Sequence, residues 1–197
     1  MMGRTPFQRA AEWRYNLVAL CRNCKGSVLA EFAAFCPIFM LLLLGGIDLS
    51  RLVILNQKLD RLATGIGDLV AQADVLTSAQ MTQIFDVTTH VASPFDFTRN
   101  GKVIVTSISL VGGVARVNWQ SAGGGSVAVT SRMGVGANAV ATLPAGLTVS
   151  GNDTLVVSEV FFTFAPLFDI GLVGGEQLYH RSFFRPRVGS LKTLGGG

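Results

Sequence analysis

The chain has 197 residues, of which 49% are hydrophobic and only 14% are charged. This composition excludes an intrinsically disordered protein, and the length suits one packed domain with a membrane segment better than two large domains. The formal net charge is +4 at pH 7, and the whole excess lies in residues 1–26. The rest of the chain is neutral, so we expect no nucleic-acid partner, which would need clustered basic residues to displace counterions.

The three cysteines do not suggest a disulfide framework. Cys21 and Cys24 lie in the basic leader and Cys36 lies in the apolar segment that follows, so nothing after residue 36 can be bridged. The CxxC spacing of Cys21 and Cys24 has no second ligand pair beside it, which makes a metal or redox role the weaker interpretation and two incidental thiols the stronger one.

An apolar run begins at Ser27 and ends at Ile47, with Glu31 as its one ionisable side chain. At about 1.5 Å per residue a helix of this length spans about 31 Å, enough to cross a bilayer. Basic residues are concentrated before the run, so the positive-inside rule predicts a cytoplasmic N-terminus and a C-terminal part outside the inner membrane. No A-x-A-like cleavage site follows the run, which indicates that it stays attached to the chain.

Glu31 is the most informative residue, because a carboxylate in a membrane helix is costly and normally has a partner or a role. It lies one turn from the start of the helix, so it could instead extend to the membrane interface. A cut after Gly26 would make Ser27 the first residue and would place its new α-amine four residues from Glu31, on the same helix face. The two opposite charges would then compensate each other, within one subunit or between neighbours.

Residues 25–32, KGSVLAEF, resemble the processing site of type IV-like prepilins. The resemblance implies a prepilin peptidase that cuts between Gly26 and Ser27, and a docking role for Glu31 during assembly. Residues 26–51 are more narrowly similar to the TadE-like pseudopilins of tight-adherence (Flp) pili, with Pro37 within the apolar run. This similarity implies a non-enzymatic minor pilin whose partners are the peptidase, other pilins, pilus assembly proteins and membrane lipid.

Three later segments extend the resemblance to the TadE-like family: residues 103–119, residues 156–168 around Glu159, and the FFRPR sequence at 183–187. The major Flp pilin is disfavoured, because Phe32 stands where that family has tyrosine after the glutamate, and because this chain is far longer. Residues 59–73 differ from the family pattern, so a TadF or truncated TadG-like assignment stays open beside TadE.

Apolar residues recur at alternating spacings of three and four after the membrane segment, which predicts an amphipathic helix that continues it. These residues are Leu52, Leu55, Leu59, Leu62, Ile66, Leu69, Ala73 and Leu76. Packing of this seam under a sheet is the preferred interpretation, with a coiled coil as the alternative. Gly65 and Gly67 predict a bend in the helix.

A further helix is expected at residues 79–91, capped by Thr77 or Ser78, and the pattern then changes to the period of two that is typical of strands. Gly112 and Gly113 predict a tight turn within a hairpin. The expected strands are residues 102–110, 115–120, 126–130, 155–164 and 177–184.

The order of elements predicts an α+β fold, with a long N-terminal transmembrane and amphipathic helix followed by an extracytoplasmic antiparallel sheet packed on it. We expect four parts of the chain: a basic leader (1–26), a transmembrane helix (27–49), an amphipathic helical region (50–100) and an antiparallel β domain (101–197).

No arrangement of residues suggests an enzyme, so we expect no catalytic residue, no cofactor, no metal and no small-molecule substrate. His90 and His180 are isolated in the sequence and are expected to face solvent. Three arginines near the C-terminus are expected to be strand-edge charges or to contact another pilus protein. An uncleaved signal-anchored binding or sensor module is the alternative function, and the role of the chain in the filament (cap, primer or accessory) stays open.

Overall fold

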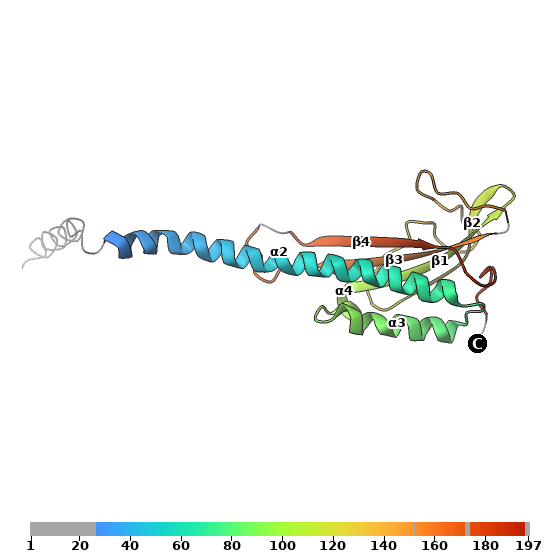
Figure 1. The fold of residues 1–197 in the computed structure, drawn as a ribbon, viewed down its shortest axis with the longest axis horizontal. Coiled ribbons are helices and arrows are strands. Elements are labelled where there is room, and N and C mark those ends of the chain that lie inside the picture. Colours follow the sequence, from blue (N-terminus) through green and yellow to red (C-terminus); the bar gives the residue numbers. More distant parts are fainter. Residues whose placement is uncertain (1–26, 152, 172–173, 196–197) are drawn as a thin grey trace, which may run out of the picture. The chain divides into compact units, whose positions relative to one another are not determined.

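The computed structural model describes residues 27–151, 153–171 and 174–195, and the predicted leader 1–26, with Cys21, Cys24 and Gly26, lies outside them. The chain forms two compact units, Met1–Ile47 and Asp48–Gly197. Its elements are the helices α2 (Ser27–Gln72), α3 (Ser78–Ala92) and α4 (Phe97–Asn100), followed by the strands β1 (Gly101–Val111), β2 (Val114–Gly123), β3 (Thr154–Phe164) and β4 (Glu176–Phe184) (Figure 1).

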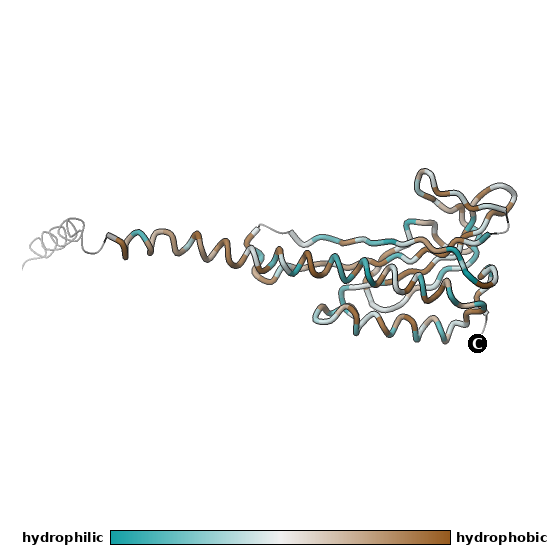
Figure 2. The backbone as a smooth tube through the Cα atoms, in the orientation of Figure 1, coloured by the Kyte–Doolittle hydropathy of each residue, from teal (hydrophilic) through white to brown (hydrophobic). Residues whose placement is uncertain are grey.

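The first part of α2, up to Ile47, is apolar on nearly every side (Figure 2). Its large side chains between Val28 and Leu43 are exposed in this unit. A helix that is apolar all round needs either lipid or other apolar helices around it, and α2 is long and apolar enough to cross a membrane.

Beyond Asp48 the same helix buries a seam against the sheet, as the sequence predicts. The buried residues of this seam are Leu55, Leu59, Leu62, Ala63, Ile66 and Val70. The prediction is wrong for one seam residue. Leu69 is 48% exposed, and Val70 is buried in its place. An α-helix has 3.6 residues per turn, so strictly alternating spacings of three and four gradually move around the helix away from the sheet. Two successive spacings of four, from Leu62 to Ile66 and from Ile66 to Val70, keep the buried residues facing the sheet.

The four strands form an antiparallel sheet in the order β2-β1-β3-β4, which confirms the predicted α+β class. Gly112 and Gly113 make the turn between β1 and β2 with φ of 59° and 81°, values that glycine adopts without strain. One face of the sheet packs against the helices, and the other face packs against residues from the long connection between β2 and β3. Since β1 and β3 are covered on both faces, their residues are almost all buried.

The strand expected at residues 126–130 is absent, and that segment has no regular secondary structure. Two of its backbone donors bond to α4 and to the first residue of β1 instead: Ser126 N donates to Thr98 O at 2.9 Å and Val127 N to Gly101 O at 3.3 Å. These two donors are therefore satisfied at α4 and the first residue of β1, and the segment does not add a strand to the sheet edge.

The predicted helix after α2 is confirmed as α3, and Thr77 is its N-cap. The Thr77 hydroxyl accepts a hydrogen bond from Gln80 N at 3.3 Å, and the Gln80 side chain accepts one from Thr77 N at 2.9 Å. This reciprocal pair satisfies two backbone donors at the helix terminus and fixes where α3 begins.

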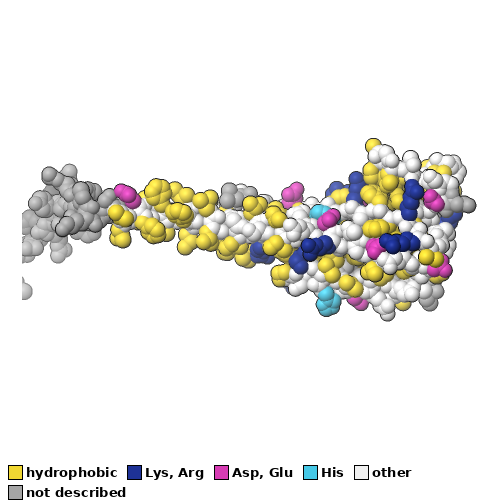
Figure 3. Space-filling model, viewed as in Figure 1, with side chains coloured by type: hydrophobic (Ala, Val, Ile, Leu, Met, Phe, Trp, Pro, Cys, Tyr) yellow, Lys and Arg dark blue, Asp and Glu magenta, His cyan; other side chains and the backbone are white. Residues whose placement is uncertain are grey.

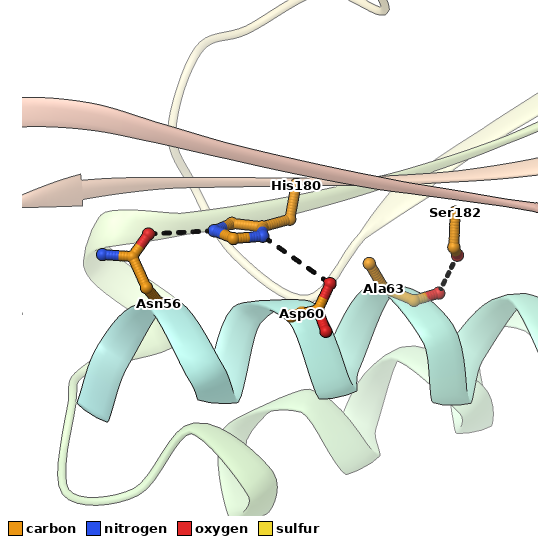
Figure 4. A network of polar contacts seen from close by, with 5 residues as sticks. All are labelled: Asn56, Asp60, Ala63, His180 and Ser182. Carbon is orange, nitrogen blue, oxygen red and sulfur yellow. Dashed lines mark hydrogen bonds and ion pairs between the residues drawn. The ribbon is translucent and has the colours of Figure 1, made fainter. Parts of the chain in front are cut away.

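The edge strand β4 is held to α2 by polar contacts. Figure 4 shows His180 between Asn56 and Asp60, and Ser182 directed at the Ala63 carbonyl oxygen. His180 Nε2 donates to Asn56 Oδ1 at 3.0 Å, and its Nδ1 lies 3.9 Å from Asp60 Oδ1. The expectation of a solvent-facing His180 is therefore wrong, because the antiparallel register turns this residue toward the helix.

The two glycines in α2 have different roles, and the helix continues through both of them to Gln72. Gly65 is exposed and has nothing within 4 Å of the position that a Cβ would take. A Cβ on Gly67 would lie 2.6 Å from a ring carbon of Phe184 and 3.1 Å from Ser182 Oγ. The sequence reads both residues as a bend, whereas Gly67 provides the space in which β4 approaches the helix.

Gly67→Ala is expected to lower the free energy of unfolding by about 1–3 kcal/mol, because Phe184 must move from its position. Gly65→Ala, two residues away on the open side, is the matched control and should raise the free energy of unfolding by up to about 1 kcal/mol through helix propensity. Urea unfolding of the full chain in detergent, followed by the fluorescence of the buried Trp119, measures both effects. Equal effects of the two substitutions would contradict this account of Gly67.

Candidate functional site

The predicted processing and docking residues lie at the start of α2. Ser27 is the first residue of the helix, and Glu31 follows one turn later as an exposed residue. In an α-helix residues four apart share a face, so the backbone nitrogen of residue 27 and the Glu31 side chain belong to the same side of α2. Gly26, the other residue of the predicted scissile bond, lies outside the described residues, so cleavage stays a prediction.

Glu31 is a carboxylate in an apolar surface. Figure 3 shows hydrophobic side chains along the first part of α2, with an acidic group near its beginning. The neighbours of Glu31 along the helix, Val28 and Phe32, are 78% and 66% exposed, as are further apolar residues up to Leu43. Such a surface suits lipid or the side chains of other apolar helices, and an ionisable residue on it marks a candidate functional position.

A second carboxylate, Glu159 of β3, is fully buried in the C-terminal unit. It accepts hydrogen bonds from Ser131 Oγ, from Arg132 N at 3.0 Å and from Tyr179 Oη at 2.8 Å. The first two donors belong to the connection between β2 and β3, and the third belongs to β4. Glu159 thus fastens this connection to the sheet through bonds to a charged acceptor, which are stronger than neutral ones.

Tyr179 and Arg132 complete this cluster. The Arg132 guanidinium carbon lies 4.0 Å from the centre of the Tyr179 ring and 5.9 Å from that of Phe161, within the range of cation–π attraction. Burial raises the pKa of Tyr179 well above its ordinary value, and the hydrogen bond to Glu159 and its negative charge add to this effect. The phenol therefore remains a hydrogen-bond donor to Glu159 at physiological pH.

A surface hollow of about 570 Å³ lies beside the cluster. Its lining is Ala128, Val129, Thr130, Ser131, Arg132, Phe161 and Gln177. Glu159 turns its oxygens to hydrogen-bond donors of its own chain, and Arg132 stacks on an aromatic ring, so these groups are engaged in holding the fold. Within the described part of the chain, no group of three or more histidine, cysteine, aspartate or glutamate side chains could hold a metal ion.

The sequence names Glu159 only within a segment of family resemblance, and its burial is a finding of the structure. A signal was present: the acid interrupts the apolar strand residues VVSEVFF, and a charge in such a strand must be paired or exposed. Arg185 and Arg187 follow the end of β4 and each lies within ion-pair distance of an acid from another part of the chain. Arg185 lies 3.7 Å from Asp153, and Arg187 lies 3.1 Å from Asp68.

Residues 26–65 match the model of the family described as TadE-like protein, the family that the sequence resembles. The match indicates a Tad pilus-associated protein and, together with the apolar helix, a membrane-anchored one. It ends within α2, so the resemblance of the three later segments stays a prediction. No curated protein and no solved structure matches the chain.

Glu159→Gln is expected to lower the free energy of unfolding by about 2–3 kcal/mol, because the charged acceptor is lost and an amide donor then faces other donors. Glu176→Gln, which removes an exposed carboxylate at the start of β4, is the control and should change the free energy by less than about 0.5 kcal/mol. Chemical denaturation of both variants in detergent provides the measurement. A Glu159→Gln variant as stable as the parent would show that the cluster is unimportant for the fold.

Proposed function

We propose that this chain, which matches the TadE-like family over residues 26–65, is a membrane-anchored minor pilin or pseudopilin needed for assembly of a tight-adherence (Flp-type) pilus. The observation that carries the proposal is the position of the match, which begins at Gly26 and extends over the apolar part of α2. That segment contains both the residues of the proposed processing site and the surface through which the helix would enter an assembly.

The proposed processing step is hydrolysis of the peptide bond between Gly26 and Ser27 by a prepilin peptidase. It removes a leader with five basic residues and one acidic residue, and it leaves a single α-amine on Ser27. The basic leader holds the N-terminus in the cytoplasm, because moving its charges into lipid is costly. Its removal allows the helix to leave its original depth in the membrane, and the protein is then the substrate of the reaction and not its catalyst.

The proposed role of Glu31 is electrostatic docking. The new amine and the Glu31 carboxylate are on one face of α2 and carry opposite charges in an apolar medium, where their attraction is much stronger than in water. Pairing within one subunit neutralises a helix that must remain in lipid. Pairing between neighbouring subunits fixes the axial position of one helix against the next, which is the requirement for an ordered filament.

The proposed location is the inner membrane, with one spanning helix, a cytoplasmic N-terminus and a periplasmic C-terminal unit. The distribution of basic residues around the apolar segment supports this orientation. In this arrangement the proposed partners are the prepilin peptidase, other pilins and pilus assembly proteins, and membrane lipid.

Cells with the peptidase are expected to contain a protein that begins at Ser27, and cells without it a protein that keeps residues 1–26. Gly26→Ala should prevent most of the cleavage, whereas Gly46→Ala, in the same helix and with nothing within 4 Å of the added Cβ, should leave it unchanged. Mass spectrometry of the N-terminus and immunoblotting measure the effect. A mature protein that still begins at Met1 would overturn the proposal and favour the uncleaved binding or sensor module.

Glu31→Gln and Glu31→Ala are expected to be cleaved normally but to enter the assembly poorly. Loss of an ion pair contributing about 1.4 kcal/mol or more would lower incorporation about tenfold or more. The readout is the number of pili per cell and the amount of this protein in sheared filament fractions. Glu12→Gln, in the segment that processing removes, is the control, and normal piliation of the Glu31 variants would contradict a docking role.

A further inference from the structure

Asp48 is the first residue after the apolar run and is only 1% exposed. Its two carboxylate oxygens accept hydrogen bonds from backbone donors of the connection between β3 and β4: Leu167 N donates to Oδ1 at 2.7 Å and Phe168 N to Oδ2 at 3.1 Å. A charged acceptor with both oxygens used in this way holds a loop firmly, because each bond is charge-assisted. The carboxylate thus fixes the position of two consecutive residues.

The residues that Asp48 holds turn apolar side chains outward. Leu167 is 59% exposed and Phe168 is 41% exposed, although both belong to a loop that the protein fixes in place. In the first two turns of α2 beyond Asp48, Leu49, Val53 and Ile54 are also about half exposed. Leu167 and Phe168 thus lie beside Asp48 at the end of the apolar run, while Leu49, Val53 and Ile54 expose apolar side chains in the turns of α2 that follow it. Exposed apolar side chains are typical of contact with a membrane or another protein.

The distance along the chain favours lipid. A run of 21 residues extends from Ser27 to Ile47 and covers the hydrocarbon thickness of a bilayer, so the residue after it reaches the level of the headgroups. Aromatic and aliphatic side chains at that level are stabilised by the boundary between headgroups and acyl chains. Leu167 and Phe168 also suit this boundary because Asp48 already satisfies their backbone donors, which lipid could not do.

We propose that residues 165–171 form a membrane-interface anchor, in which Leu167 and Phe168 insert into the bilayer that α2 spans and Asp48 supports the loop from inside the protein. This inference rests on the proposed function only for the membrane-spanning helix, and it is independent of cleavage and of pilus assembly. The anchor fixes the C-terminal unit at the membrane surface through a second contact beside the helix.

The test uses Phe168→Trp in the full chain, with Trp13→Phe to simplify the spectrum and with the buried Trp119 as a constant background. The protein is placed in nanodiscs that carry one chain each, made with phospholipids brominated on the acyl chains. The emission of the tryptophan introduced in the loop is expected to be strongly quenched by the bromine and poorly quenched by aqueous acrylamide.

Val111→Trp is the matched control. Val111 is 53% exposed and lies at the β1–β2 turn, and the register of β1 with β3 places this turn at the opposite end of the sheet from Phe164. A tryptophan there is expected to be quenched by acrylamide and unaffected by brominated lipid. The contrast between the two positions separates insertion of the loop from general contact of the protein with the membrane.

Asp48→Asn tests the support, because an amide retains only one acceptor oxygen for the two backbone donors. When this substitution is combined with Phe168→Trp, the loop tryptophan is expected to lose a large part of its quenching by brominated lipid, with the circular dichroism unchanged. Asp86→Asn, an exposed acid on α3, is the control and should leave the quenching as it was.

Three results with the Phe168→Trp variant would overturn the anchor. The first is quenching of the loop tryptophan by acrylamide but not by bromine, and the second is shielding of this tryptophan from both quenchers. The third is shielding from acrylamide only in nanodiscs that carry several copies of the chain. The second result would place the loop against protein of its own chain, and the third would place it against a second copy. Bromine quenching in a chain that still has its leader would support the anchor while the proposed pilin function fails. Normal processing without bromine quenching would contradict the anchor and leave the proposed pilin function supported.

Discussion

One helix has to satisfy two different surroundings, and this constraint governs the rest of the structure. α2 is apolar on nearly every side up to Ile47, and beyond Asp48 it buries a seam that runs from Leu55 to Val70. The first part needs lipid or other apolar helices, whereas the second part needs a complementary apolar surface in water. The antiparallel sheet provides that surface.

Buried acids connect this framework to its loops. Asp48 holds the connection between β3 and β4, and Glu159 holds the connection between β2 and β3. Both carboxylates accept bonds from backbone amides, so a charge removed from water is compensated by dipoles that the fold has oriented. Long loops that lack secondary structure thereby obtain defined positions on the sheet and beside α2.

β4 packs against α2 at a glycine that leaves space for an aromatic ring, and side-chain hydrogen bonds join the two elements. Gly67 leaves room for the Phe184 ring, while His180 and Ser182 bond to groups on the helix. Sequence patterns predict β4 itself, because its apolar and polar residues alternate. They do not predict what its inward residues meet, since that depends on which turn of α2 lies under the strand. The sequence alone therefore predicted a solvent-facing His180, which is wrong, and did not indicate the space that Gly67 leaves for Phe184.

The sequence by itself determined the apolar helix, the family resemblance, the β1–β2 turn at Gly112 and Gly113, and the α+β class, because periodicity, length and turn chemistry are local properties. The burial of Asp48 and Glu159 was decided only by the tertiary structure, because the donors that compensate each carboxylate are brought to it from distant parts of the chain. Leu167 N is 119 positions from Asp48, and Ser131 is 28 positions from Glu159. Only folding brings such groups within hydrogen-bonding distance.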